Sequence, residues 1–233
     1  MRNAIAGTYL TRDIRPRTAA IVAGIALLVM AVIAALSNFG AISALTVPGN
    51  AGATARNLVS SAALFRLGAV GLIVTAILDV LVAWALYVVL RTVNPSLSLL
   101  GAWFRLVYAA IFAAAVTNLF SALRAAPVEP AETLFLLKTF DQGWHIGLIV
   151  FGFHLGVVGV LVWRPGFFSR LVSVLLAVAA VGYIVDSLGT LLSPTYSLGL
   201  STFTFVGEVV FIFWLLIHGR KLPDAHRTST EPL

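Results

Sequence analysis

The chain has 233 residues, of which 60% are hydrophobic and only 10% are charged, and its mean hydropathy is +1.02. A soluble domain carries about 25% charged residues, so this composition excludes one and indicates an integral membrane protein. The absence of cysteine excludes disulfides, thiolate metal ligands and cysteine nucleophiles. The formal net charge of +6 is accounted for by basic residues that flank membrane spans, so we expect no nucleic-acid partner.

The pattern along the chain predicts an all-α fold, a six-helix transmembrane bundle whose N- and C-termini are cytoplasmic. A basic arm over residues 1–17 precedes the membrane domain (18–218), and a polar tail over 219–233 follows it. The longer loops between the spans are expected over 37–64 and 124–141. The expected spans are 18–36, 65–90, 97–123, 143–163, 171–192 and 201–218.

Most Lys and Arg residues fall in the arm, in the turns after the second and fourth spans, and in the tail. The excess of positive charge in these segments places both termini in the cytoplasm. The expected location is therefore a bacterial inner membrane, with the lipid bilayer as the partner that the sequence implies. Nothing in the sequence points to a particular protein partner.

Charged residues inside the spans are the features that need an explanation, because a charge facing lipid costs about 2.5–3.5 kcal/mol. Asp79 in the second span and Arg105 in the third lie at similar depth from the turn that joins them. We predict that they form an ion pair, which His154 at the centre of the fourth span could join.

A second polar group is expected nearer the outer face. Tyr183, Asp186 and Ser187 share one stripe of the fifth span, and Glu208 lies at matching depth in the sixth. Arg66 and His145 enter from the outer ends of the second and fourth spans. The candidate ligand-binding pocket therefore consists of Arg66, His145, Tyr183, Asp186, Ser187 and Glu208. Because two neighbouring carboxylates cannot both stay ionised cheaply, either a proton or a cation is expected to share the site.

No cofactor and no metal are expected. The four histidines lie at different depths, which does not suit haem, and the HExxH zinc signature is absent. Ser187 beside His145 is the one pair that could serve an intramembrane serine hydrolase. Both polar groups could also be buried networks that only fix the register of the helices.

The order of these polar residues, with the short segments around them, resembles a bacterial integral-membrane family known as domain of unknown function number forty-three eighty-six. The resemblance extends from about residue 18 to 221 and rests on Arg66, Asp79, Arg105, Phe151-Gly152-Phe153-His154, Pro165-Gly166-Phe167-Phe168-Ser169-Arg170, Gly182-Tyr183-Ile184-Val185-Asp186, Gly207-Glu208 and Trp214-Leu215-Leu216. It implies six spans, cytoplasmic termini and no established activity. It also implies that Arg66, Arg105, His154, Asp186 and Glu208 belong together.

Three functions remain open at this stage. The first is a small-solute or proton-coupled binder or transporter that uses the outer polar pocket, and the residues favour it over an enzyme. The second is a membrane-embedded enzyme that acts on a lipid. The third is a structural or regulatory membrane subunit.

Overall fold

The computed structural model describes residues 14–163, 170–193 and 195–219, and these are helical with short connections and no strand. Most of the predicted N-terminal arm, the basic turn before Arg170 and most of the predicted tail lie outside the described residues.

Five apolar helices in the described part of the chain are long enough to cross a membrane, which makes this a membrane protein. The first is α1 (Pro16–Ser37), which continues through a π-helical turn, η1 (Asn38–Ile42), and the short α2 (Ser43–Leu45). The other four are α4 (Ala62–Leu90), α5 (Pro95–Ala125), α6 (Pro130–Val162) and α7 (Arg170–Leu192).

The sixth predicted span is a broken helix. It consists of α8 (Ser201–Thr204) and α9 (Val206–His218), separated at Phe205. The apolar run Thr202–His218 is about 26 Å long at 1.5 Å per residue, shorter than the other five.

Two of the predicted loops contain more helix than expected. Most of 37–64 is helical, because α2 and α3 (Ala51–Ser60) lie in it and α4 begins at Ala62. Within 124–141, α6 starts at Pro130, which occupies the first turn of the helix together with Glu132. Proline is well tolerated at that position, and a carboxylate there favours the helix dipole. The loop between α5 and α6 is therefore only a few residues long.

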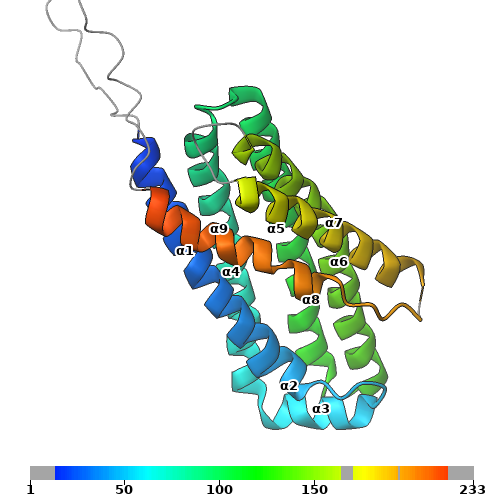
Figure 1. Ribbon diagram of the computed structural model, residues 1–233. Coiled ribbons are helices and arrows are strands. Elements are labelled where there is room, and N and C mark those ends of the chain that lie inside the picture. Colours follow the sequence, from blue (N-terminus) through cyan, green and yellow to red (C-terminus); the bar gives the residue numbers. More distant parts are fainter. Residues whose placement is uncertain (1–13, 164–169, 194, 220–233) are drawn as a thin grey trace, which may run out of the picture.

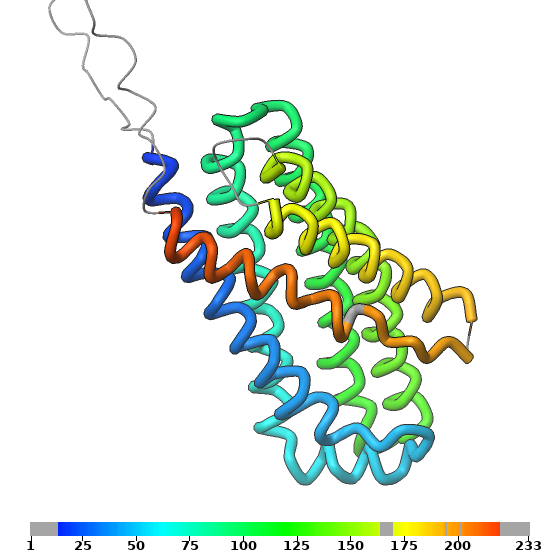
Figure 2. The backbone as a smooth tube through the Cα atoms, viewed as in Figure 1, coloured from blue at the N-terminus to red at the C-terminus, as the bar shows by residue number. Residues whose placement is uncertain are grey.

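The helices form a closed ring in which chain neighbours are also spatial neighbours. α1 packs on α4, α4 on α5, α5 on α6, α6 on α7, and α7 on α9, which returns to α1 (Figure 1). The short α3 lies across one end of the bundle and contacts α6 and α4. The start of α1 and the end of α9 lie at the same end of the bundle, as Figure 2 shows for the blue and red ends of the tube.

Small residues let these helices approach closely. A Cβ at Gly152 of α6 would lie 2.5 Å from Ile184 of α7, and one at Gly207 of α9 would meet the Leu175 carbonyl. Gly219, which follows α9, abuts Ala20 of α1. Helix association in membranes depends on such close contacts, as expected for the glycine-rich face of α6. The ring encloses the polar side chains described next.

Candidate functional site

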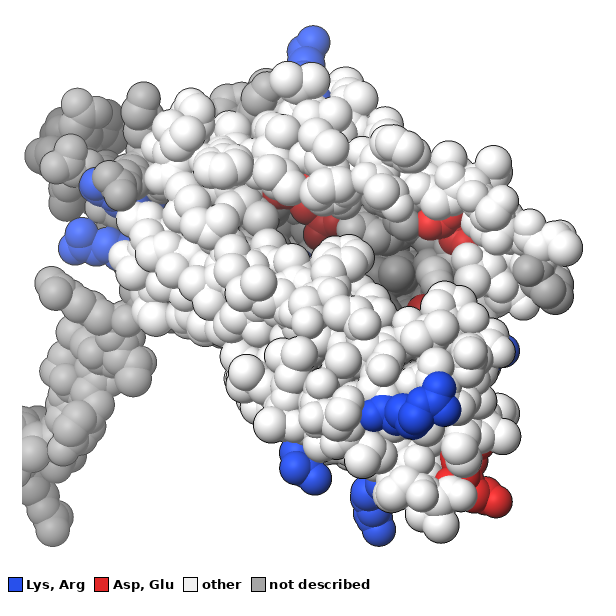
Figure 3. Space-filling model, turned by 90° about the horizontal axis from the view of Figure 1, so that it is seen from below, with Lys and Arg blue, Asp and Glu red and all other residues white. Residues whose placement is uncertain are grey.

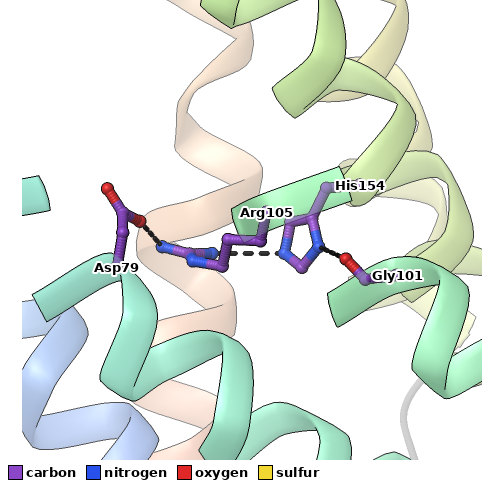
Figure 4. A network of polar contacts seen from close by, with 4 residues as sticks. All are labelled: Asp79, Gly101, Arg105 and His154. Atoms are coloured by element: carbon purple, nitrogen blue, oxygen red, sulfur yellow. Dashed lines mark hydrogen bonds and ion pairs between the residues drawn. The ribbon is translucent and has the colours of Figure 1, made fainter. Parts of the chain in front are cut away.

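A buried ion pair lies at the centre of the bundle. Nη2 of Arg105, on α5, is 2.6 Å from Oδ1 of Asp79, on α4, and both side chains are almost inaccessible, at 2% and 1% exposure (Figure 4). On the other side of the guanidinium, Nη1 lies 3.2 Å from Nε2 of His154, on α6. The structure therefore brings together all three residues of the predicted inner group.

The lengths of the helices explain this meeting. Asp79 lies about 16 Å before the end of α4, and Arg105 about 15 Å after the start of α5. The tight turn between Arg91 and Asn94 holds these ends together, and the Asn94 side chain caps α5 by accepting the Leu97 amide at 3.0 Å. Two antiparallel helices joined in this way bring residues of equal depth to the same level.

The hydrogen bonds fix the state of His154. An arginine side chain can only donate, so Nε2 of His154 accepts from Arg105 and carries no proton. Nδ1 lies 2.8 Å from the carbonyl oxygen of Gly101 and must donate to it. His154 is therefore a neutral imidazole with its proton on Nδ1, an assignment that follows from its partners. It adds no positive charge to the centre.

Aromatic rings enclose the guanidinium. The Arg105 Cζ lies 5.3 Å from the centroid of the Phe151 ring, a cation–π contact. Phe151 in turn packs against Tyr108 at 4.8 Å, and against Tyr183 edge-on at 5.7 Å. Tyr108 was not among the predicted residues, although its position one turn after Arg105 on α5 places both on the same helix face.

Glu208 belongs to this central group. Its carboxylate interacts electrostatically with Tyr183, Arg105 and Asp79. The depth argument from the sequence placed Glu208 level with Asp186. The centre thus collects side chains from five helices, namely Asp79 (α4), Arg105 and Tyr108 (α5), His154 (α6), Tyr183 (α7) and Glu208 (α9).

The charges in this centre do not balance. Asp79 pairs with the guanidinium of Arg105, the Glu208 carboxylate interacts electrostatically with both, and His154 is neutral. The pairing is also incomplete among the described residues, because Oδ2 of Asp79 and Nε of Arg105 are buried without a hydrogen-bond partner. A net negative charge at a buried site is costly, so a proton or a cation is needed to neutralise it.

Asp186 holds the segment that leads into α8. Its Oδ1 accepts the Leu200 amide at 3.0 Å. Removal of the phenol from water, and the nearby Asp186 carboxylate, raise the pKa of Tyr196. Asp186 therefore has a clear anchoring role, because it fixes the loop that positions α8 and α9.

Two more members of the predicted pocket meet each other. Nδ1 of His145 lies 3.3 Å from Oγ of Ser187, and its Nε2 lies 3.9 Å from Oδ2 of Asp141, beyond hydrogen-bond range. Arg66, by contrast, is exposed and makes no hydrogen bond or ion pair with the other pocket residues in the described part of the chain. The six residues predicted as one pocket therefore divide into the Glu208–Tyr183 pair, the Asp186 anchor, the His145–Ser187 pair and the separate Arg66.

Acidic side chains are also gathered at one face of the molecule. Viewed from below, the surface is hollowed, and acidic atoms (red) lie in and beside the hollow, whereas Lys and Arg (blue) lie away from it (Figure 3).

A cleft of about 340 Å³ lies between η1–α2 and the start of α6, and Lys138 and Asp141 contribute to its wall. Among the described residues, no group of three His, Asp or Glu side chains could hold a metal ion.

Comparison with known proteins assigns the chain to a family. The family model described as "Domain of unknown function (DUF4386)" matches residues 22–219. The chain belongs to this family. It is also 38% identical over 159 residues to an uncharacterised protein of Archaeoglobus fulgidus, an alignment that covers 68% of this chain and 88% of that protein. No solved structure matches the chain.

Proposed function

We propose that this chain is a six-span protein of the cell membrane, with both termini in the cytoplasm. Its polar centre binds either a proton or a small cation and exchanges one for the other. The observation that carries the proposal is the charge count. Asp79 and Glu208 share one guanidinium, so the centre is neutral only when it holds one further positive charge. When a monovalent cation enters, one proton leaves to water, and the total charge is conserved.

The shape of the bundle supports the topology. The ring of six helical segments has the start of α1 and the end of α9 at the same end, as an even number of crossings requires (Figure 2). The α8–α9 segment is about 26 Å long, close to the roughly 30 Å of a hydrocarbon core. The break at Phe205 is compatible with a span, because irregular backbone is tolerated where it lines a protein interior.

The hollow seen in Figure 3 supports access for a cation. Its acidic side chains raise the local concentration of positive ions, and the basic residues lie away from it. At the centre, the Phe151, Tyr108 and Tyr183 rings pack against one another, and aromatic rings attract cations, including an organic cation such as a substituted ammonium. A small cationic solute is therefore the ligand class that the site fits best.

Proton release on cation binding tests this function. The purified chain, in detergent and weak buffer near pH 7, is mixed in turn with sodium, ammonium and tetramethylammonium chloride, and a pH-sensitive dye reports the protons released. We expect about one proton per chain for at least one of the three cations, and none after Glu208→Gln. Glu132→Gln, which removes an exposed acid at the start of α6, is the matched control and should behave as wild type. No release with any of the three would contradict the proposal.

A lipid-acting enzyme is the second candidate, and the contact between His145 and Ser187 favours it. A base beside a hydroxyl is the start of a nucleophilic site. It ranks second because Asp141 lies 3.9 Å from His145 and Ser187 is almost fully buried, at 1% exposure. Labelling of Ser187 by a lipophilic fluorophosphonate in wild type, lost in His145→Ala, would favour the enzyme.

A further inference from the structure

A cleft in the described part of the chain lies on the outer flank of the bundle, away from the polar centre. It has a volume of about 480 Å³. Its walls are Trp163 at the end of α6, the outward face of α7 from Ser173 to Gly182, and Leu200 and Thr204 of the α8 segment.

The walls of this groove suit hydrocarbon. Val174, Val178 and Val181 along α7 are exposed at 46%, 49% and 61%. The Ser173 hydroxyl does not offer its donor to the groove, because it donates to the Gly159 carbonyl at 2.5 Å. At membrane depth such a groove cannot be filled by water at low cost, so an apolar chain is its natural occupant.

The length of the groove matches one leaflet of a bilayer. From Ser173 to Gly182 the helix rises about 14 Å, and half of a hydrocarbon core is about 15 Å. The groove begins near the start of α7 and ends near its middle. One acyl chain that enters from the membrane interface would therefore lie along its full length.

A positive charge stands at the interfacial end. Arg170 precedes Ser173 by one helical turn, is exposed, and has its Cζ 5.9 Å from the Trp163 ring that closes the groove. Arg170 makes no ion pair with an acid among the described residues. A guanidinium is always protonated and matches the geometry of a phosphate, and tryptophan is typical of the interface.

We propose that this groove binds one acyl chain of an anionic phospholipid, whose headgroup phosphate pairs with Arg170. This site is independent of the proton or cation site, because it lies on the flank of α7 and shares no residue with the centre. The bound lipid would fill the gap between the end of α6, α7 and α8, and so support the α8–α9 segment that carries Glu208.

Native mass spectrometry of the full chain tests the proposal. The protein, stripped of lipid in detergent, is titrated with dioleoylphosphatidylglycerol and, separately, with dioleoylphosphatidylcholine. We expect one tightly retained phosphatidylglycerol per chain and weaker retention of phosphatidylcholine. Arg170→Gln should lower phosphatidylglycerol affinity about fivefold, the effect of one Arg near an anionic lipid, and should lower phosphatidylcholine affinity by less, because the choline cation offsets the charge of its phosphate.

Two matched controls separate the groove from general charge and surface effects. Arg91→Gln removes another arginine that lies beside an aromatic ring, Tyr87 at 5.9 Å, and should leave retention unchanged. Ala177→Trp fills the groove from an exposed position and should abolish the tight site, whereas Ala110→Trp on the exposed face of α5 should not. Because these alanines are exposed, neither variant disturbs the core.

The proposal is overturned by any of four results. Three concern lipid retention, namely equal retention of the two lipids, an equal loss in Arg170→Gln and Arg91→Gln, and tight retention that survives Ala177→Trp. The fourth is a dimer that excludes lipid, because a second copy would then be the occupant.

Discussion

Removing Arg105 should damage the protein more than removing Asp79, its partner in the ion pair. Arg105→Gln leaves two carboxylates near each other with no counter-charge, the buried Asp79 and the half-buried Glu208. Breaking a buried pair in this way costs about 3–5 kcal/mol. Asp79→Asn leaves Arg105 with Glu208, one charge against one, so the loss should be about 1–3 kcal/mol, as for a polar group left with a poorer partner.

The assay is thermal unfolding in mild detergent, followed by circular dichroism. For a chain of this size, 1 kcal/mol shifts Tm by about 2–4 °C, so Arg105→Gln should lower Tm by about 6–20 °C. The decrease for Asp79→Asn should be smaller in the same buffer. Glu132→Gln, at an exposed site on α6, should leave Tm unchanged and serves as the control.

The relative size of the decrease in Tm for the two variants tests whether Glu208 belongs to the central group. If Asp79→Asn lowers Tm as much as Arg105→Gln or more, then Arg105 has no second carboxylate to pair with. Glu208 would in that case lie outside the central group, and the charge count that supports cation binding would be refuted.

Two further predictions concern the packing of α9 and the loop before it. A Cβ at Gly207 would meet the Leu175 carbonyl, so Gly207→Ala should cost about 1–3 kcal/mol in thermal unfolding. Gly156→Ala should be neutral, since its Cβ would lie 3.9 Å from the nearest atom, and equal losses would contradict the packing. Removal from water and the nearby Asp186 carboxylate raise the pKa of Tyr196 above its unfolded value of about 10. The contribution of Tyr196 to the free energy of unfolding is then complete below pH 10 and is lost as the pH rises through the folded pKa. Tyr196→Phe should therefore flatten the alkaline decline of Tm. An unchanged decline would exclude this role.

The inner group could be predicted because a tight turn fixes its geometry. Asp79 and Arg105 lie on consecutive helices joined between Arg91 and Asn94, so counting residues from that turn sets their relative depth. A buried charge also needs a partner, which restricts the choice further. His154 at the centre of the next helix followed from the same count.

The position of Glu208 could not be predicted in this way. Depth alone matched it to Asp186, because nothing in an apolar helix shows which face turns inward. A break at Phe205 separates α8 from α9 just before Glu208. The contacts of Gly207 with α7 then fix which way α9 faces, and these depend on tertiary packing.

The start of α6 was interpreted as a loop because its residues are polar. The sequence did contain a signal for a helix, since Thr133, Leu137 and Phe140, at helical spacing, are buried, and Pro130 stands in the first turn. Hydropathy finds the part of a helix that crosses the hydrocarbon, and it misses the turns that extend beyond it.

Infrared spectroscopy of the carboxyl groups tests the account most directly. The C=O stretch of a protonated carboxylic acid is separate from that of a carboxylate, so it reports whether Asp79 and Glu208 share a proton. At pH 7 and without added cation, wild type should show this band. The band should disappear in Glu208→Gln, and it should weaken when the cation that releases a proton is added. A spectrum at pH 7 with no protonated carboxyl, or a band that is unchanged in Glu208→Gln, would contradict a centre neutralised by a proton.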